Sequence, residues 1–160
     1  MADNLTTGIG TVLFVSDTIP ATLDEAGFAA VTTWIEVGEI TEIPEYGGSS
    51  EVVTHTPLKT GVQEKFHGPS NAGSLSIPMA YDPSDAGQVI LKDAKADKKQ
   101  RAFKVEYPEV AANATAPRKD YFVGKVFGVT RSATTNGVVA GTVTVELDME
   151  PIEVLETTGP

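Results

Sequence analysis

Apolar and polar side chains alternate regularly along residues 138–150. A period of two indicates a strand with one buried face and one face in water. We expect residues 121–131 to form its partner strand, joined by a hairpin at Asn136-Gly137, because both of these residues tolerate a positive φ. Since a two-stranded hairpin is marginal in water, the rest of the chain must complete the sheet. The apolar faces contain Val139, Val143, Val145, Leu147 and Met149 in one strand and Tyr121, Val123, Phe127 and Val129 in the other.

Four other segments are predicted to be strands, namely residues 10–16, 34–43, 74–81 and 101–107. In residues 34–43 the apolar phase slips after Gly38, which suggests a β-bulge. Residues 74–81 alternate regularly but contain Pro78, which cannot donate a backbone hydrogen bond. This strand is therefore expected at a sheet edge or at a bulge.

One helix is predicted, beginning at Asp82-Pro83-Ser84-Asp85 and continuing to about residue 97. Asp82 is the expected N-cap, with Pro83 in the first turn. The expected apolar stripe contains Ala86, Val89, Ile90 and Ala94. Together, the strands and this helix predict a single, mainly β domain spanning residues 1–160. We expect a β-sandwich or partly closed barrel with one flanking α-helix.

A long polar loop is predicted over residues 44–73, which contain several glycines and prolines but few large apolar side chains. Long loops in compact domains usually bind something or stay disordered. We expect a loose hairpin within it, too polar to pack on its own domain. Residues 1–8 are predicted to form a flexible arm, and residues 151–160 a short tail that frays.

Composition restricts the chemistry. The net charge of −10 argues against a protein that grips nucleic acid by neutralising phosphates. The absence of cysteine excludes thiolate metal sites and disulfides, and we expect no cofactor. His55 and His67 lack metal-ligand spacing and are interpreted as exposed loop histidines. No nucleophile–base or phosphate-loop motif is present, so an enzyme is not expected.

Two charged groups have alternative interpretations. Lysines on and after the helix are most simply cations at its C-terminal end, and otherwise a nucleic-acid patch or a contact with an acidic neighbouring subunit. Glu146, Asp148 and Glu150 form an acidic row on the polar face of residues 138–150. Solvation explains this row, but a wholly polar strand face also suits the wall of a water-filled channel.

An ordered series of segments resembles the major tail tube protein of phages with long, non-contractile tails. The series covers most of the chain, from about Gly8 to Met149, and no single motif decides it. It consists of residues 34–47 (WIEVGEITEIPEYG), 53–58 (VTHTPL), 64–68 (EKFHG), 73–78 (GSLSIP) and 82–88 (DPSDAGQ), supported by residues 20–30 and 121–126.

The resemblance implies the tail-tube fold and a structural virion protein. Six copies would form a ring, and rings would stack into a tube through which DNA passes without specific binding. The tube would be assembled in the host bacterial cytoplasm, and a membrane would not be among its partners. Other partners would be the tape measure, tail terminator and distal tail proteins.

The resemblance also assigns surfaces. The long loop would reach a neighbouring ring or subunit, and Glu146 and Asp148 are candidates to face the lumen. An acidic lumen would repel DNA phosphates. The candidate contact residues of the loop are Glu51, His55, Leu58, Lys59, Lys65 and His67. The alternative function is a monomeric β-sandwich binding or adhesion module, which would not polymerise.

Overall fold

The computed structural model describes residues 5–108 and 111–159. The strands are β1 (Val12–Ser16), β2 (Ile35–Glu36), β3 (Ser49–His55), β4 (Glu64–Asn71), β5 (Ser74–Ala80), β6 (Arg101–Glu106), β7 (Ala114–Ala116), β8 (Lys119–Ser132), β9 (Ala140–Leu147), β10 (Ile152–Val154) and β11 (Thr157–Thr158). The described helices are α1 (Glu25–Ala29) and α2 (Ala86–Asp97).

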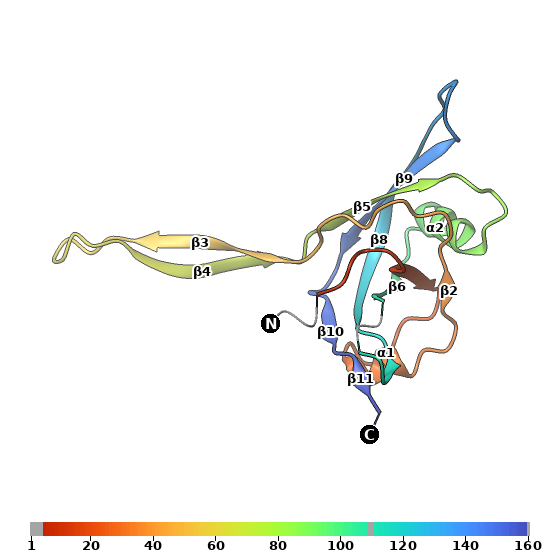
Figure 1. Ribbon diagram of the computed structural model, residues 1–160. Helices are drawn as coiled ribbons and strands as arrows, with labels where there is room; N and C mark the ends of the chain where they lie inside the picture. Colours follow the sequence, from red (N-terminus) through yellow and green to blue (C-terminus); the bar gives the residue numbers. More distant parts are fainter. Residues whose placement is uncertain (1–4, 109–110, 160) are drawn as a thin grey trace.

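One antiparallel sheet of seven strands forms the body of the molecule (Figure 1). Its order is β2-β1-β6-β8-β9-β5, and β10 pairs with the first residues of β8. Strands β3 and β4 form a separate hairpin, and β7 and β11 form a small ribbon. The prediction of a mainly β fold with a flanking helix is confirmed. Strand β5 lies at an edge, as Pro78 indicates, and the Pro78 carbonyl accepts a hydrogen bond from the Thr41 amide at 3.1 Å.

The main hydrophobic core lies between one face of this sheet and α2. Phe103 of β6 and Phe122 of β8 are fully buried there, with their rings stacked 5.2 Å apart. Leu91 and Ala94 of α2 pack against the same cluster. On β9 the predicted alternation is confirmed, and the core residues there are Val143, Val145 and Leu147.

A smaller cluster covers part of the opposite face. Phe28 of α1 stacks on Tyr121 of β8 at 5.1 Å, and Trp34 lies 5.9 Å from the same tyrosine ring. These rings cover β6 and the first half of β8 on the face of the sheet that points away from the main core. The rest of this face, on β5 and β9, is mostly polar and includes Ser74, Ser76, Thr142, Thr144 and Glu146.

The predicted apolar face of residues 121–131 is wrong, because β8 changes phase along its length. Its first half is buried on both faces, so alternation carries no signal there. Phe127 lies on the side away from the main core and is 64% exposed, and a register shift between Val126 and Gly128 then brings Val129 against that core.

The predicted strand over residues 34–43 is also largely wrong, since only Ile35–Glu36 is a strand. Val37 is buried, but Ile35 is exposed. The backbone turns at Gly38 and Glu39, and the φ of Glu39 is 60°. The turn carries the chain from β2, at one edge of the sheet, to β5 at the other edge, where Ile40 forms a bridge with Met79.

The N-cap of α2 is Asp85 rather than the predicted Asp82. The Asp85 carboxylate accepts a hydrogen bond from the Gln88 amide at 2.8 Å and also bonds the Gly38 amide at 3.2 Å. Asp82 instead accepts bonds from the amide and hydroxyl of Ser84, which lowers its pKa. The predicted stripe is corrected as well: Leu91 is buried and Val89 is exposed.

Three connecting segments differ from their predictions. Asn136 and Gly137 do not form the predicted tight turn, and neither has a positive φ. The pairing of β8 with β9 ends at Ser132 and Ala140, and a longer loop joins the two strands. The tail of residues 151–160 does not fray within its described part, where β10 pairs with β8 and β11 with β7. Of the predicted N-terminal arm, residues 1–4 lie outside the described residues, and residues 5–8 are exposed.

The corrected burial of the two phenylalanines of β8 can be tested with two matched substitutions. Phe122→Ala should lower the free energy of unfolding by about 3–5 kcal/mol, because it leaves a cavity in the core. Phe127→Ala should change it by about 0.5 kcal/mol or less, because that ring lies on the surface. Urea denaturation of the monomer measures both, and equal losses would contradict the assignment of Phe122 to the core and Phe127 to the surface.

The corrected N-cap gives a second prediction. Asp85→Ala should destabilise the protein by about 1–2 kcal/mol, because it removes the capping bond, whereas Asp85→Asn should retain most of the stability. Asp82→Ala serves as the control, since it disturbs only bonds to Ser84. If thermal or urea unfolding showed a larger loss of stability for Asp82→Ala than for Asp85→Ala, Asp82 would be the N-cap.

Candidate inter-subunit surface

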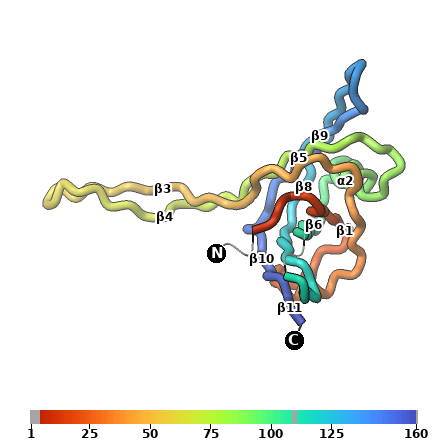
Figure 2. The backbone as a smooth tube through the Cα atoms, viewed as in Figure 1, coloured from red at the N-terminus to blue at the C-terminus, as the bar shows by residue number. Residues whose placement is uncertain are grey.

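The hairpin of β3 and β4, here called the arm (residues 49–71), projects far from the body of the molecule (Figure 1). The tube view shows the same extension, with none of the other described segments beside it (Figure 2). Its seven β3 residues alone span about 23 Å at the usual rise per residue. Every residue of β3 is exposed, and Leu58, in the turn between β3 and β4, is fully exposed. The prediction of a hairpin that does not pack on its own domain is confirmed.

Both faces of the arm carry apolar side chains. Val53 lies directly opposite Phe66 on one face, and they are 48% and 54% exposed. Val52 lies opposite His67 on the other face and is 65% exposed. An isolated two-stranded ribbon with exposed apolar side chains on both faces is marginal in water. Exposed apolar side chains grouped in this way are typical of an interaction site.

The residues predicted as loop contacts all lie on this arm and are all exposed. Glu51 and His55 are in β3, and Lys65 and His67 are in β4. His55 faces Glu64 across the hairpin. Leu58 and Lys59 lie in the connecting turn. The structure brings these residues together on one projection, but their contacts with a neighbour stay a prediction.

The root of the arm is fixed by close backbone packing. Gly47 and Gly73 have φ values of 135° and 92°, and a Cβ added to Gly73 would lie 2.2 Å from the Gly47 carbonyl oxygen. The Gly73 amide donates to Asn71 Oδ1 at 2.9 Å, and its carbonyl accepts from the Leu147 amide at 3.0 Å. A backbone hydrogen bond at Gly73 therefore connects the root of the arm to β9.

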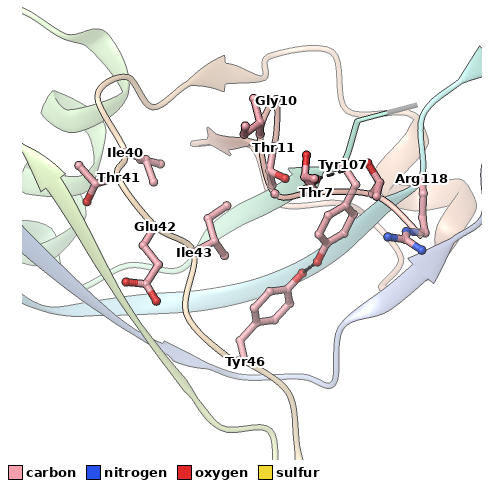
Figure 3. A pocket seen from close by; sticks show the side chains of 13 residues that line it. Thr7, Gly10, Thr11, Ile40, Thr41, Glu42, Ile43, Tyr46, Tyr107 and Arg118 are labelled. Carbon is pink, nitrogen blue, oxygen red and sulfur yellow. Dashed lines mark hydrogen bonds between the residues drawn. The ribbon is translucent and has the colours of Figure 1, made fainter. Parts of the chain in front are cut away.

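A second anchor lies just before the root, at Tyr46 (Figure 3). The Tyr46 hydroxyl is hydrogen-bonded to the Tyr107 hydroxyl and to the Asp120 carboxylate. The Tyr107 hydroxyl donates a second hydrogen bond to the same carboxylate at 2.9 Å. The Tyr46 ring also packs against Phe122. Because Tyr46 belongs to the core, the free part of the predicted loop begins after it. A large aromatic residue in an otherwise polar stretch was the available sequence signal.

The anchor is suited to holding structure rather than to proton transfer. Burial raises the pKa of Tyr107 to about 12, and burial together with Asp120 raises the pKa of Tyr46 further. Both hydroxyls therefore keep their protons near neutral pH. They border an open groove of about 690 Å³ in which the Arg118 guanidinium lies over the Tyr107 ring at 4.9 Å (Figure 3).

The polar face of the sheet contains the two other predicted site residues. Glu146 on β9 is exposed and lies opposite Lys125 of β8. The Asp148 carboxylate pairs with the Lys125 ammonium at 3.6 Å and accepts from the Gln100 amide at 2.6 Å. Two carboxylates and one ammonium leave this patch with a net charge of −1. The structure thus places Glu146 and Asp148 on the face opposite α2.

Among residues 5–108 and 111–159, no group of three or more His, Asp or Glu side chains is arranged to hold a metal ion. In the same residues, no helix is long and apolar enough to cross a bilayer.

The fold is similar to those of tube subunits from phage tails and related particles. One similar structure is the tail of an empty GTA particle, with a TM-score of 0.65 and 14% identity, covering 94% of this chain and 99% of that chain. Another is the SPP1 tail tube, with a TM-score of 0.61 and 16% identity, covering 93% and 77%. A third is the sheath/tube terminator of an extracellular contractile injection system (PVC), with a TM-score of 0.67 and 9% identity, covering 94% and 96%.

The family comparison is more specific than this likeness in fold. The model described as "Phage tail tube protein, TTP" matches residues 8–154, so the chain belongs to the phage tail tube protein family. It is a structural protein of a tail tube, and its family is not a class of enzymes. No curated protein sequence matches the chain.

The independence of the arm from the body can be tested by deletion. Residues 49 and 71 pair at its base, so replacing residues 49–71 with two glycines joins neighbouring chain ends. We expect the shortened protein to unfold within about 1 kcal/mol of the full chain, because no core side chain is removed. Circular dichroism and urea denaturation measure this. A protein left unfolded by the deletion would show that the arm belongs to the core.

Proposed function

We propose that this chain assembles into stacked hexameric rings that form the tail tube of a siphophage, through which DNA is delivered to the host. The observation that carries the proposal is the arm, whose exposed Val52, Val53, Leu58 and Phe66 belong to neither hydrophobic cluster of the described residues. A subunit of this kind completes its packing with another copy. The membership of the tail tube family and the C6 symmetry of the similar GTA tail support six copies per ring.

The arm is proposed to reach a subunit of the neighbouring ring through Glu51, His55, Leu58, Lys59, Lys65 and His67. A contact between unlike surfaces repeats without closing, which allows rings to stack into a filament. Assembly would take place in the bacterial cytoplasm, and the finished tube would be part of the virion. The tape measure, tail terminator and distal tail proteins are the proposed further partners.

The polar face of β5, β8 and β9 is proposed to line the lumen, with Glu146 and Asp148 facing the DNA. Its Ser and Thr hydroxyls can be hydrated, and its net negative charge repels phosphate and keeps DNA from sticking. Core packing supports the orientation, because the other face of the same strands is buried in the main core. The monomeric binding module remains as the second candidate.

Electron microscopy of the purified protein, co-expressed with tail-initiation proteins, separates the two candidates. Hollow rods or hexameric rings are expected. Only monomers at high concentration would favour the binding module. Removal of the arm by the deletion described above should abolish the rods while the monomer stays folded.

The lumen assignment is tested by accessibility in assembled tubes, since the chain has no native cysteine. Glu146→Cys should react with a small maleimide but be protected from a polymer-linked maleimide too bulky to travel along the lumen. Lys95→Cys, on the exposed side of α2, is the matched control and should react with both. Rapid labelling of Cys at position 146 by the bulky reagent would place Glu146 on the outer wall and leave the tube assignment standing.

A further inference from the structure

The loop between β8 and β9 forms a second projection, here called the tip (residues 132–140). It leaves the body in a different direction from the arm (Figure 1). Residues 132–139 are all exposed, and Val138 and Val139 are 74% and 46% exposed. Phe127, near the tip on β8, is 64% exposed. The tip therefore presents adjacent apolar side chains to solvent at the end of a hairpin.

The tip is also uncharged. No charged residue occurs from Ser132 to Val145, in a chain in which 21% of residues are charged. Surfaces that remain in water are normally rich in charge, and an uncharged projection with exposed valines is typical of a contact surface. Its lack of charge matters here, because copies of a protein with a net charge of −10 repel each other.

The arm contains charged residues but has no net charge. Its ionic side chains are Glu51, Glu64, Lys59 and Lys65, so two negative and two positive charges give a net charge of zero. The whole net charge of −10 therefore belongs to the remaining residues of the chain. Arm and tip are therefore two projections on which acidic subunits can meet without net repulsion.

From these observations we propose that the tip of one subunit packs against the arm of a second copy, with Val138 and Val139 contacting the apolar side chains around Val53 and Phe66. This inference rests on the proposed tube function. Because arm and tip leave the body in different directions, one chain does not bring them together. The contact joins unlike surfaces of two copies, as stacking requires.

Photo-cross-linking tests the contact directly. Benzoylphenylalanine replaces Val138, tubes are assembled and irradiated, and the cross-linked peptides are identified by mass spectrometry. We expect attachment to residues 49–71 of another copy. The same probe at Lys95, on the exposed side of α2, is the control and should not label the arm. Attachment of the Val138 probe outside residues 49–71, or only within its own chain, overturns the proposal.

A substitution gives an independent readout. Val138→Asp should raise the critical concentration for assembly at least tenfold, because it buries a carboxylate, while urea denaturation of the monomer stays unchanged. Assembly of Val138→Asp at the wild-type concentration overturns the tip–arm contact. The two proposals fail separately. If the unmodified chain forms no tubes, the tube function fails, whereas tubes in which the probe labels another surface remove only this contact.

Discussion

The structure depends on the burial of β8 on both faces of one open sheet. Phe122 faces the main core beneath α2, and its neighbours Tyr121 and Val123 face the second cluster beneath α1. The same strand pairs with β6, β9 and β10. Two clusters that meet on one strand stabilise each other, because loss of β8 would expose both. The body is thereby rigid enough to hold two long hairpins in fixed directions.

The direction of the arm follows from that rigidity. The arm itself has no core, so its orientation is set at its root, by the packing of Gly47 on Gly73 and by the bonds from Tyr46 to Tyr107 and Asp120. Asp120 is the second residue of β8. The central strand therefore controls where a surface far from it points. An interface built on a core-anchored projection loses less conformational entropy on binding than one built on a free loop.

The sequence predicted those elements whose two faces differ. Strands β5 and β9 each have one buried and one wet face, so their alternation was readable, and Pro78 identified β5 as an edge strand. The predictions failed where both faces are buried, as in the first half of β8, or where tertiary contacts reshape the chain, as at Gly38, whose amide bonds Asp85. The Asp85 cap was missed for a related reason, because Asp82 and Asp85 have equal intrinsic capping preference and the contact with Gly38 lies 47 residues away. The loop that carries the candidate surface was predicted from its composition and its contact role from the family resemblance, whereas the tip was missed because its uncharged sequence was interpreted only as a turn.

Charge and shape together explain why the apolar surface is placed on projections. A body with strong negative charge stays soluble and resists random association, but it also opposes the approach of its own copies. Screening at physiological ionic strength acts over about 8 Å, so acidic surfaces repel strongly only at close range. Projections without net charge can make contact while the acidic bodies remain further apart. In the arm this is achieved by balancing two glutamates with two lysines, and in the tip by omitting charge altogether. The same acidic surplus that opposes collapse onto other subunits would, on the inner wall of a tube, also repel the phosphates of DNA.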